Sequence, residues 1–192
     1  MDESIKGSVD DMMWRHHLSP REGFRLPDGA LSGSHVHCTS VFRGAAGRGS
    51  GALMLSERRE TVAEQSLPTD DADVMSYQVA TDVRALRAFV SAGALARGLP
   101  VERMELLTLA VSELATNTLQ HTTGGGLVRL WVEPGQLCCD VIDKGPTRTF
   151  GRDMPAADSV RGRGLAIVEQ ICDEVAVLTS AGTTFVRIRL SL

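Results

Sequence analysis

Aromatic residues are scarce in this sequence, which has two Trp, one Tyr and five Phe among its 192 residues. No run of Lys or Arg forms a stripe with interleaved aromatics. The 20 basic side chains are outnumbered by 24 acidic ones, which gives a formal net charge of -4. Proteins that bind nucleic acid directly need a basic surface, so the composition argues against that class of function.

Long apolar runs are also missing, so no segment is expected to cross a membrane as a helix. The N-terminus reads Met-Asp-Glu-Ser and lacks the cationic head and apolar stretch of a secretory signal. No Cys-x-x-Cys pair is present, and we predict free thiols in a reducing compartment. The cysteines are Cys38, Cys138, Cys139 and Cys172. We therefore expect a cytoplasmic protein that does not associate with membranes.

The first third of the chain differs in composition from the rest. Residues 1–66 scatter Gly, Ser, Pro, Arg and His without sustained periodicity, which predicts a mostly disordered extension. Residues 67–192 remain for one folded domain. A translation start at Met54 or Met75 would keep every motif described below.

Periodicity within 67–192 predicts strands and helices in a definite order. We expect strands at 74–80, 127–133, 137–143, 174–179 and 183–190, helices at 81–97, 101–121 and 164–173, and a mobile functional loop at 144–161. In the last strand Val186 and Ile188 share one face and Arg187 the other, so one face should be buried and the other exposed to solvent; Arg129 should lie on the exposed face too. This pattern predicts an α/β two-layer sandwich, in which helices cover one face of a mainly antiparallel mixed sheet.

The helix at 101–121 carries polar side chains on a single stripe. Glu113, Asn117 and His121 are spaced four residues apart, so they project in the same direction. An apolar stripe borders them, made up of Met104, Leu107, Val111, Leu114 and Thr118. Because a carboxylate at the border of a core needs a partner, the spacing suggests a site that holds a cation or an ordered water. For the triplet alone, the solvent edge of an amphipathic helix is the simpler interpretation.

Two glycine-containing segments follow. Asp143 ends a strand, where its carboxylate can accept a hydrogen bond from an exocyclic amine, and Gly145 permits close approach of a flat ring; alone, Asp-x-Gly is also a common turn. Further on, Gly162 and Gly164 precede an apolar-periodic helix. Backbone N–H groups at such a helix start bind anions, and Arg163 beside them adds positive charge.

A fourth segment, Gly182-Thr183-Thr184-Phe185, opens the last strand. The hydroxyl of Thr183 can point into a pocket that the Asp143 carboxylate also faces, or Thr183 can be an ordinary β-branched strand residue after a turn. Neither a dinucleotide-binding glycine fingerprint after a strand nor a Walker motif is present.

In this order, the four segments resemble the Bergerat fold, the ATP-binding fold of sensor histidine kinases and type II topoisomerases. The resemblance covers residues 74–192. The form Glu-Leu-x-x-Asn-x-x-x-His in the helix and the form Gly-Arg-Gly-Leu at the second glycine segment are most similar to the anti-sigma-factor serine kinases of Gram-positive bacteria.

The resemblance implies a role for each matching residue. Glu113 would be the catalytic base, and Asn117 would coordinate Mg²⁺ on the phosphates of ATP. Asp143 would bind the adenine amino group. The residues implied to bind the nucleotide are Asn117, His121, Asp143, Gly145, Gly162, Arg163, Gly164, Leu165 and Thr183. The loop at 144–161 would be the ATP lid, although the usual second glycine after Asp143 is replaced by Thr147.

The function that this resemblance implies is that of a cytoplasmic ATP-binding regulator. Such a protein sequesters a sigma factor and phosphorylates a serine on an anti-anti-sigma protein of the STAS class, and it works as a homodimer. The alternative is a non-catalytic ATP-dependent switch of the same fold that holds a partner without phosphotransfer. A detached module of a histidine kinase fits less well, because no helical hairpin with a phosphoacceptor histidine is evident.

Overall fold

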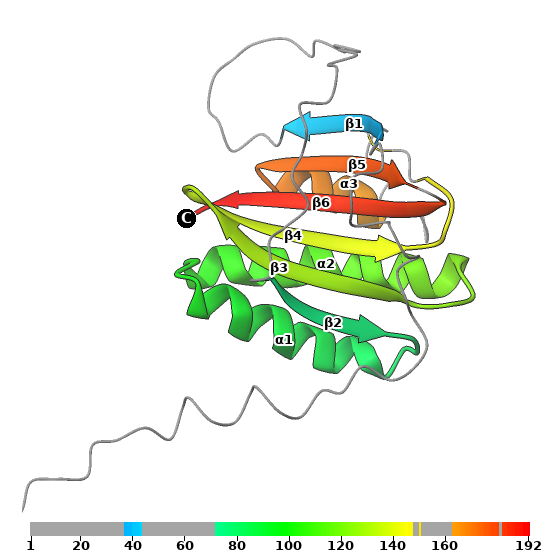
Figure 1. Cartoon of the computed structure of the whole chain (residues 1–192). Helices are drawn as coiled ribbons and strands as arrows, with labels where there is room; N and C mark the ends of the chain where they lie inside the picture. The colour runs from blue at the N-terminus through cyan, green and yellow to red at the C-terminus, as the bar shows by residue number, and fades with distance from the viewer. Residues whose placement is uncertain (1–36, 44–71, 148–149, 151–162, 181) are drawn as a thin grey trace, which may run out of the picture.

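The computed structural model describes residues 37–43, 72–147, 150, 163–180 and 182–192; for residues 37–43 and Arg163 the description is limited to the backbone. Figure 1 shows a sheet with helices behind it. In chain order the elements are β1 (His37–Arg43), β2 (Asp73–Tyr77), α1 (Asp82–Ala96), α2 (Val101–His121), β3 (Gly126–Glu133), β4 (Gln136–Asp143), α3 (Arg163–Ile171), β5 (Glu174–Ser180) and β6 (Thr183–Ser191).

The strands form one six-stranded sheet in the order β1-β5-β6-β4-β3-β2. Every pairing between these described strands is antiparallel. All of the described helices pack on the same face, and their apolar residues join those of the sheet in one core. The predicted two-layer α/β sandwich with helices on one face is therefore confirmed.

The helix and hairpin predictions agree with the observed bounds within a few residues. The helix expected at 101–121 is α2, and its buried residues repeat at helical spacing. Gly135 and Gly182 both have a φ of 75°, which is the left-handed region that glycine adopts without strain, and they turn the chain in the β3–β4 and β5–β6 hairpins. None of the helices among the described residues has the length and apolarity needed to cross a bilayer.

Strand β1 was not expected. Its residues 37–43 lie inside the stretch that we predicted to be a disordered extension, yet they pair with β5 from His37↔Thr179 to Arg43↔Glu174. A short strand without clear alternation gives no local sequence signal when its partner is far away along the chain. The remainder of the predicted extension lies outside the described residues, as do residues 148–149 and 151–162 of the loop predicted at 144–161.

The sheet face opposite the helices also differs from the expectation. We expected Arg129 and Arg187 to be exposed to solvent, but they are only 4% and 1% exposed. Both bind the fully buried Asp140: Arg187 donates from Nε to Oδ1 at 2.8 Å, and Arg129 donates from Nη2 to Oδ2 at 2.8 Å. Arg187 also lies over the ring of Trp131. Burial would lower the pKa of Arg187, but Asp140 outweighs it and keeps that pKa above its usual value.

Removing the charge of Asp140 is expected to destabilise the fold strongly. Asp140→Asn removes the charged carboxylate that both buried arginines bind, and breaking comparable buried pairs costs about 3–5 kcal/mol. The matched control is Asp73→Asn, because the Asp73 side chain is 54% exposed and pairs with Arg97 at 2.8 Å. An exposed pair of that kind contributes at most about 1 kcal/mol. Urea unfolding of both variants measures the difference, and equal losses would show that the buried cluster has no special role.

The described cysteines are buried free thiols, as predicted, namely Cys138, Cys139 and Cys172. Burial is the main cause that raises the pKa of Cys172 to about 12, and it raises that of Cys138 to about 12 as well. These thiols are therefore protonated near neutral pH and are unsuited to nucleophilic chemistry.

Candidate functional site

Helix α2 presents its polar stripe at the edge of the helical layer. Glu113 and Asn117 are partly buried there, whereas His121 at the end of the helix is exposed. The neighbouring face of the same helix is buried and includes Leu114 and Thr118. The stripe predicted from the spacing thus borders the core, but the structure does not bury His121 with the other two residues.

The start of α3 lies directly against this stripe. A Cβ atom added to Gly164 would be 2.6 Å from Glu113 Oε2 and 3.6 Å from Asn117 Nδ2. Since real Cβ atoms do not approach a heavy atom at 2.6 Å, only glycine fits here without displacing Glu113. The structure therefore brings Glu113, Asn117 and the N-terminal turn of α3 together.

The structure describes the other residues of the second glycine segment, 162–165, less completely. Leu165 is partly buried and packs against the core. Arg163 is the first residue of α3, and its side chain is outside the description; Gly162 lies outside the described residues altogether. A helix of nine residues that starts beside Glu113 and Asn117 offers backbone N–H groups for an anion, because its first-turn N–H groups lack partners within the helix.

A second cluster is centred on Asp143 at the end of β4. Asp143 is fully buried and accepts a hydrogen bond from Thr118 Oγ1 at 2.6 Å on Oδ2. It accepts another from the backbone N–H of Gly145 at 2.8 Å on Oδ1. Thr118 directly follows Asn117, so two consecutive residues of α2 reach the two clusters. The Asp143 and Gly145 predicted from the sequence do lie together.

Close packing requires glycine at position 145. A Cβ there would be 2.6 Å from Thr122 Cγ2 and 2.9 Å from Asp143 Oδ1. Thr122 follows the last residue of α2, and its own Oγ1 is buried without a hydrogen-bond partner among the described residues. A buried hydroxyl without a partner is unfavourable, so Thr122 is a good candidate to bind a ligand atom.

The threonine predicted from the last strand lies on the far side of the sheet. Thr183 pairs with Ser180 and shares its face with Phe185, away from the core that the helices cover. Its neighbour Thr184 faces the helices, sits opposite Asp143, and donates from Oγ1 to the carbonyl oxygen of Gly145 at 3.0 Å. The hydroxyl that reaches the Asp143 cluster is therefore that of Thr184.

Three residues of these clusters were not predicted from the sequence, namely Thr118, Thr122 and Thr184. Thr118 could have been predicted, because a hydroxyl inside an apolar stripe needs a buried hydrogen-bond partner. Nothing in the sequence distinguishes Thr122 or Thr184, since each is an ordinary residue at a helix end or after a turn.

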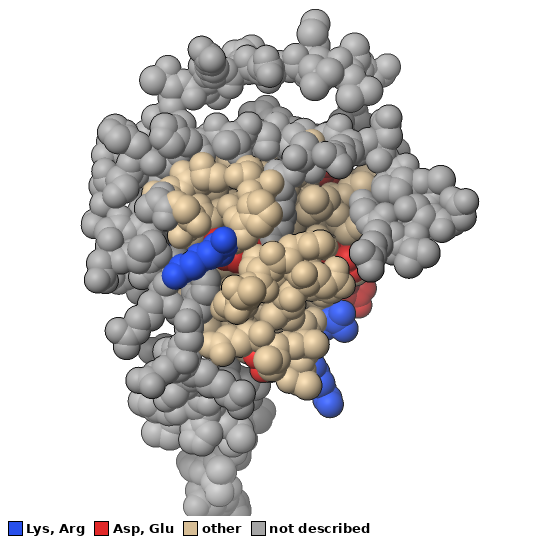
Figure 2. Space-filling model, turned by 90° about the vertical axis from the view of Figure 1, so that its right-hand side faces the viewer, with Lys and Arg blue, Asp and Glu red and all other residues tan. Residues whose placement is uncertain are grey.

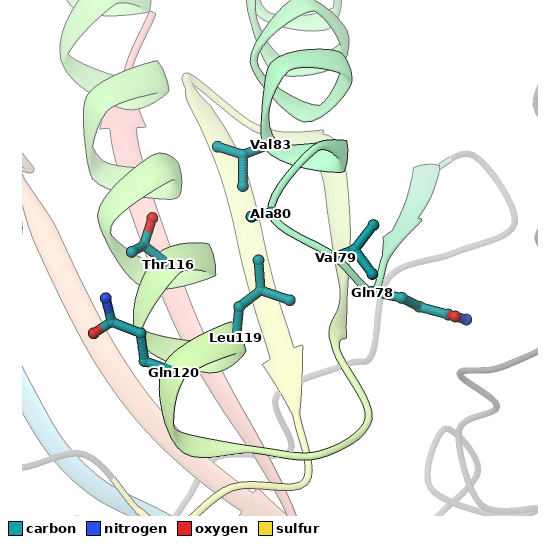
Figure 3. Close-up of a pocket in the computed structure, with 7 residues that line it drawn as sticks. All are labelled: Gln78, Val79, Ala80, Val83, Thr116, Leu119 and Gln120. Atoms are coloured by element: carbon teal, nitrogen blue, oxygen red, sulfur yellow. The ribbon is translucent and has the colours of Figure 1, made fainter.

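A groove of about 480 Å³ lies on the other side of α2 (Figure 3). It is lined by Gln78, Val79, Ala80, Val83, Thr116, Leu119 and Gln120. Val83 and Leu119 point toward one another across it, whereas Gln78 points away. None of the lining residues is charged, and none belongs to the Glu113 or Asp143 cluster.

Figure 2 shows the end of the molecule at which α2 and β4 finish, which lies on the right of Figure 1. The described surface at this end carries few Lys, Arg, Asp or Glu side chains. No group of three or more His, Cys, Asp and Glu side chains in the described ranges is placed to hold a metal ion.

Comparison with known proteins points to one family. The model of the histidine kinase-like ATPase domain matches residues 77–190. A solved structure of the RsbU and RsbW domains of Rv1364c from Mycobacterium tuberculosis is similar at 20% identity and a TM-score of 0.49, over 66% of this chain and 34% of that one. The chain thus spans about a third of the length of that structure. No curated protein matches the sequence.

Proposed function

Because the chain belongs to the histidine kinase-like ATPase family, we propose that it binds ATP with Mg²⁺ between α2, α3 and the ends of β4 and β6. The observation that carries this proposal is the pair of contacts made by α2. Glu113 and Asn117 lie against Gly164 at the start of α3, and Thr118 on the next position bonds to Asp143. One helix therefore contacts both the glycine at the start of α3, where phosphate is proposed to bind, and the carboxylate proposed to bind the base.

The residues present suit these ligands. Asp143 is a buried acceptor for the adenine amino group, and the Gly145 N–H that donates to its Oδ1 holds the carboxylate in place. Thr122 supplies a buried hydroxyl that has no partner among the described residues. Asn117 would hold Mg²⁺ through its amide oxygen, a hard ligand of the kind that this ion prefers. The first turn of α3 would bind phosphate oxygens.

We further propose that the protein is an anti-sigma factor and a serine kinase for a STAS-type anti-anti-sigma protein. Bound Mg²⁺ would neutralise charge on the transferring phosphoryl group. Glu113 accepts the proton of the attacking serine hydroxyl, whose oxygen forms a bond to phosphorus while the bond to the ADP oxygen breaks. The absence of a side chain at Gly164 leaves the space that the Glu113 carboxylate occupies, because a Cβ there would be 2.6 Å from Oε2. We also propose that the protein sequesters a sigma factor and acts as a homodimer.

The second candidate is a nucleotide-dependent switch that binds a partner without phosphotransfer. Thr147 in place of the second glycine after Asp143 favours it, because a stiffer chain there hinders closure of the loop at 144–161.

One assay separates the two functions. Purified protein is incubated with radiolabelled ATP and each STAS protein of its host, and phosphoserine is measured. The kinase proposal expects phosphoserine on at least one of them. If ATP and a sigma factor both bind but no STAS protein is labelled, the switch is the correct function.

A further inference from the structure

The hydrogen bond between Thr118 and Asp143 is directional. Thr118 Oγ1 lies 2.6 Å from Asp143 Oδ2 and 3.1 Å from the carbonyl oxygen of Leu114. A hydroxyl has one proton to donate, and 2.6 Å is typical of a hydroxyl that donates to a carboxylate. Thr118 therefore donates mainly to Asp143.

The carboxylate is held on its other oxygen as well. The Gly145 N–H donates to Oδ1 at 2.8 Å, and the carbonyl of Gly145 in turn accepts from Thr184 Oγ1 at 3.0 Å. A donor on each oxygen fixes the plane of the Asp143 carboxylate relative to α2 and β6. The carboxylate therefore presents a hydrogen-bond acceptor to a ligand in a fixed direction.

From this geometry we infer that Thr118 is a positioning residue that makes the proposed nucleotide site select 6-aminopurine nucleotides over 6-oxopurine nucleotides. The inference rests on the proposed nucleotide-binding function. A 6-amino group donates to the fixed carboxylate, whereas a 6-oxo group would bring an acceptor against an acceptor and leave both unpaired. Without the Thr118 hydroxyl the carboxylate loses the donor on Oδ2, so its plane is held less firmly and the preference for the amino group falls.

A chemical double-mutant cycle tests the role of Thr118. Dissociation constants are measured by calorimetry for wild type and Thr118→Val with ATP and with purine riboside triphosphate, which lacks the 6-amino group. We expect the substitution to weaken the binding of ATP about tenfold and that of purine riboside triphosphate less than about twofold. The reason is that only ATP has an amino group that bonds to the positioned carboxylate. The preference for ATP over GTP should fall by about the same tenfold factor.

Two further variants separate positioning from packing. Thr118→Ser keeps the hydroxyl and should bind ATP within about threefold of wild type. Thr116→Val removes a hydroxyl of the same helix that bonds to the carbonyl of Ser112 at 2.8 Å, and it should leave both affinities unchanged. If Thr118→Val fails to fold, Thr118→Ala takes its place in the cycle with the same expected result.

The outcomes are distinct from those that test the proposed function. If Thr118→Val weakens the binding of both ligands equally, or of neither, the positioning role is overturned. The proposal that the protein binds ATP would still stand. A wild-type protein that binds neither ATP nor purine riboside triphosphate overturns the proposed function, and this inference with it.

Discussion

Replacing Glu113 with Gln should abolish most phosphotransfer and leave nucleotide binding nearly unchanged. A general base contributes about 10²–10⁴-fold to the rate, and the isosteric amide cannot take the serine proton. Gln fills the same space beside Gly164, where Glu113 Oε2 leaves no room for a Cβ atom. Single-turnover phosphorylation and calorimetric ATP binding, measured on the same preparation, should therefore separate chemistry from binding.

The matched control for this prediction is Glu105→Gln. Glu105 is an exposed glutamate of the same helix, two turns before Glu113. It should leave both the rate and the affinity at wild-type values. Equal rates for wild type and Glu113→Gln would remove Glu113 from the catalytic role, and a parallel loss of ATP affinity would make it a binding residue instead.

Replacing Asp143 with Ala should weaken ATP binding on the order of a hundredfold, because the buried amino group of the base loses its acceptor. The Thr118 hydroxyl and the Gly145 N–H lose their shared partner as well, so some loss of stability is expected too. Calorimetry with ATP, at a temperature where circular dichroism shows the variant folded, measures the first effect alone.

Asp140→Asn is the counterpart that separates stability from binding. Asp140 lies three residues earlier in β4, on the opposite face of the sheet, and it binds Arg129 and Arg187 rather than any residue of the site. While folded, this variant should bind ATP like wild type despite its lower stability. If Asp143→Ala also binds like wild type, Asp143 is not part of the nucleotide site.

The two-layer fold could be predicted because its signals are local. Helix α2 has an apolar stripe at helical spacing, and the hairpins have Gly135 and Gly182 at their turns. The resemblance assigned Glu113 and Gly164 to one site, and the structure places them side by side, an arrangement that periodicity alone cannot give.

Features that depend on pairing across the sheet could not be predicted. Alternation placed Arg129 and Arg187 on one face correctly, but it could not show that both meet Asp140 and become buried. The choice between Thr183 and Thr184 depends on a register of one residue, and a shift of one residue exchanges the faces of a strand. Only the pairing of Thr184 with Asp143 settles it.

The central claim is that nucleotide binds where α2, α3, β4 and β6 meet. Titration of the ¹⁵N-labelled full chain with Mg²⁺·ATP, followed by amide chemical shifts, tests it most directly. The largest shifts are expected at Asn117, Gly145, Gly164 and Thr184, while Gly135 at the opposite end of β4 should not move. Shifts centred on Val79, Val83 and Leu119 would instead place the ligand in the groove of Figure 3 and contradict the proposed site.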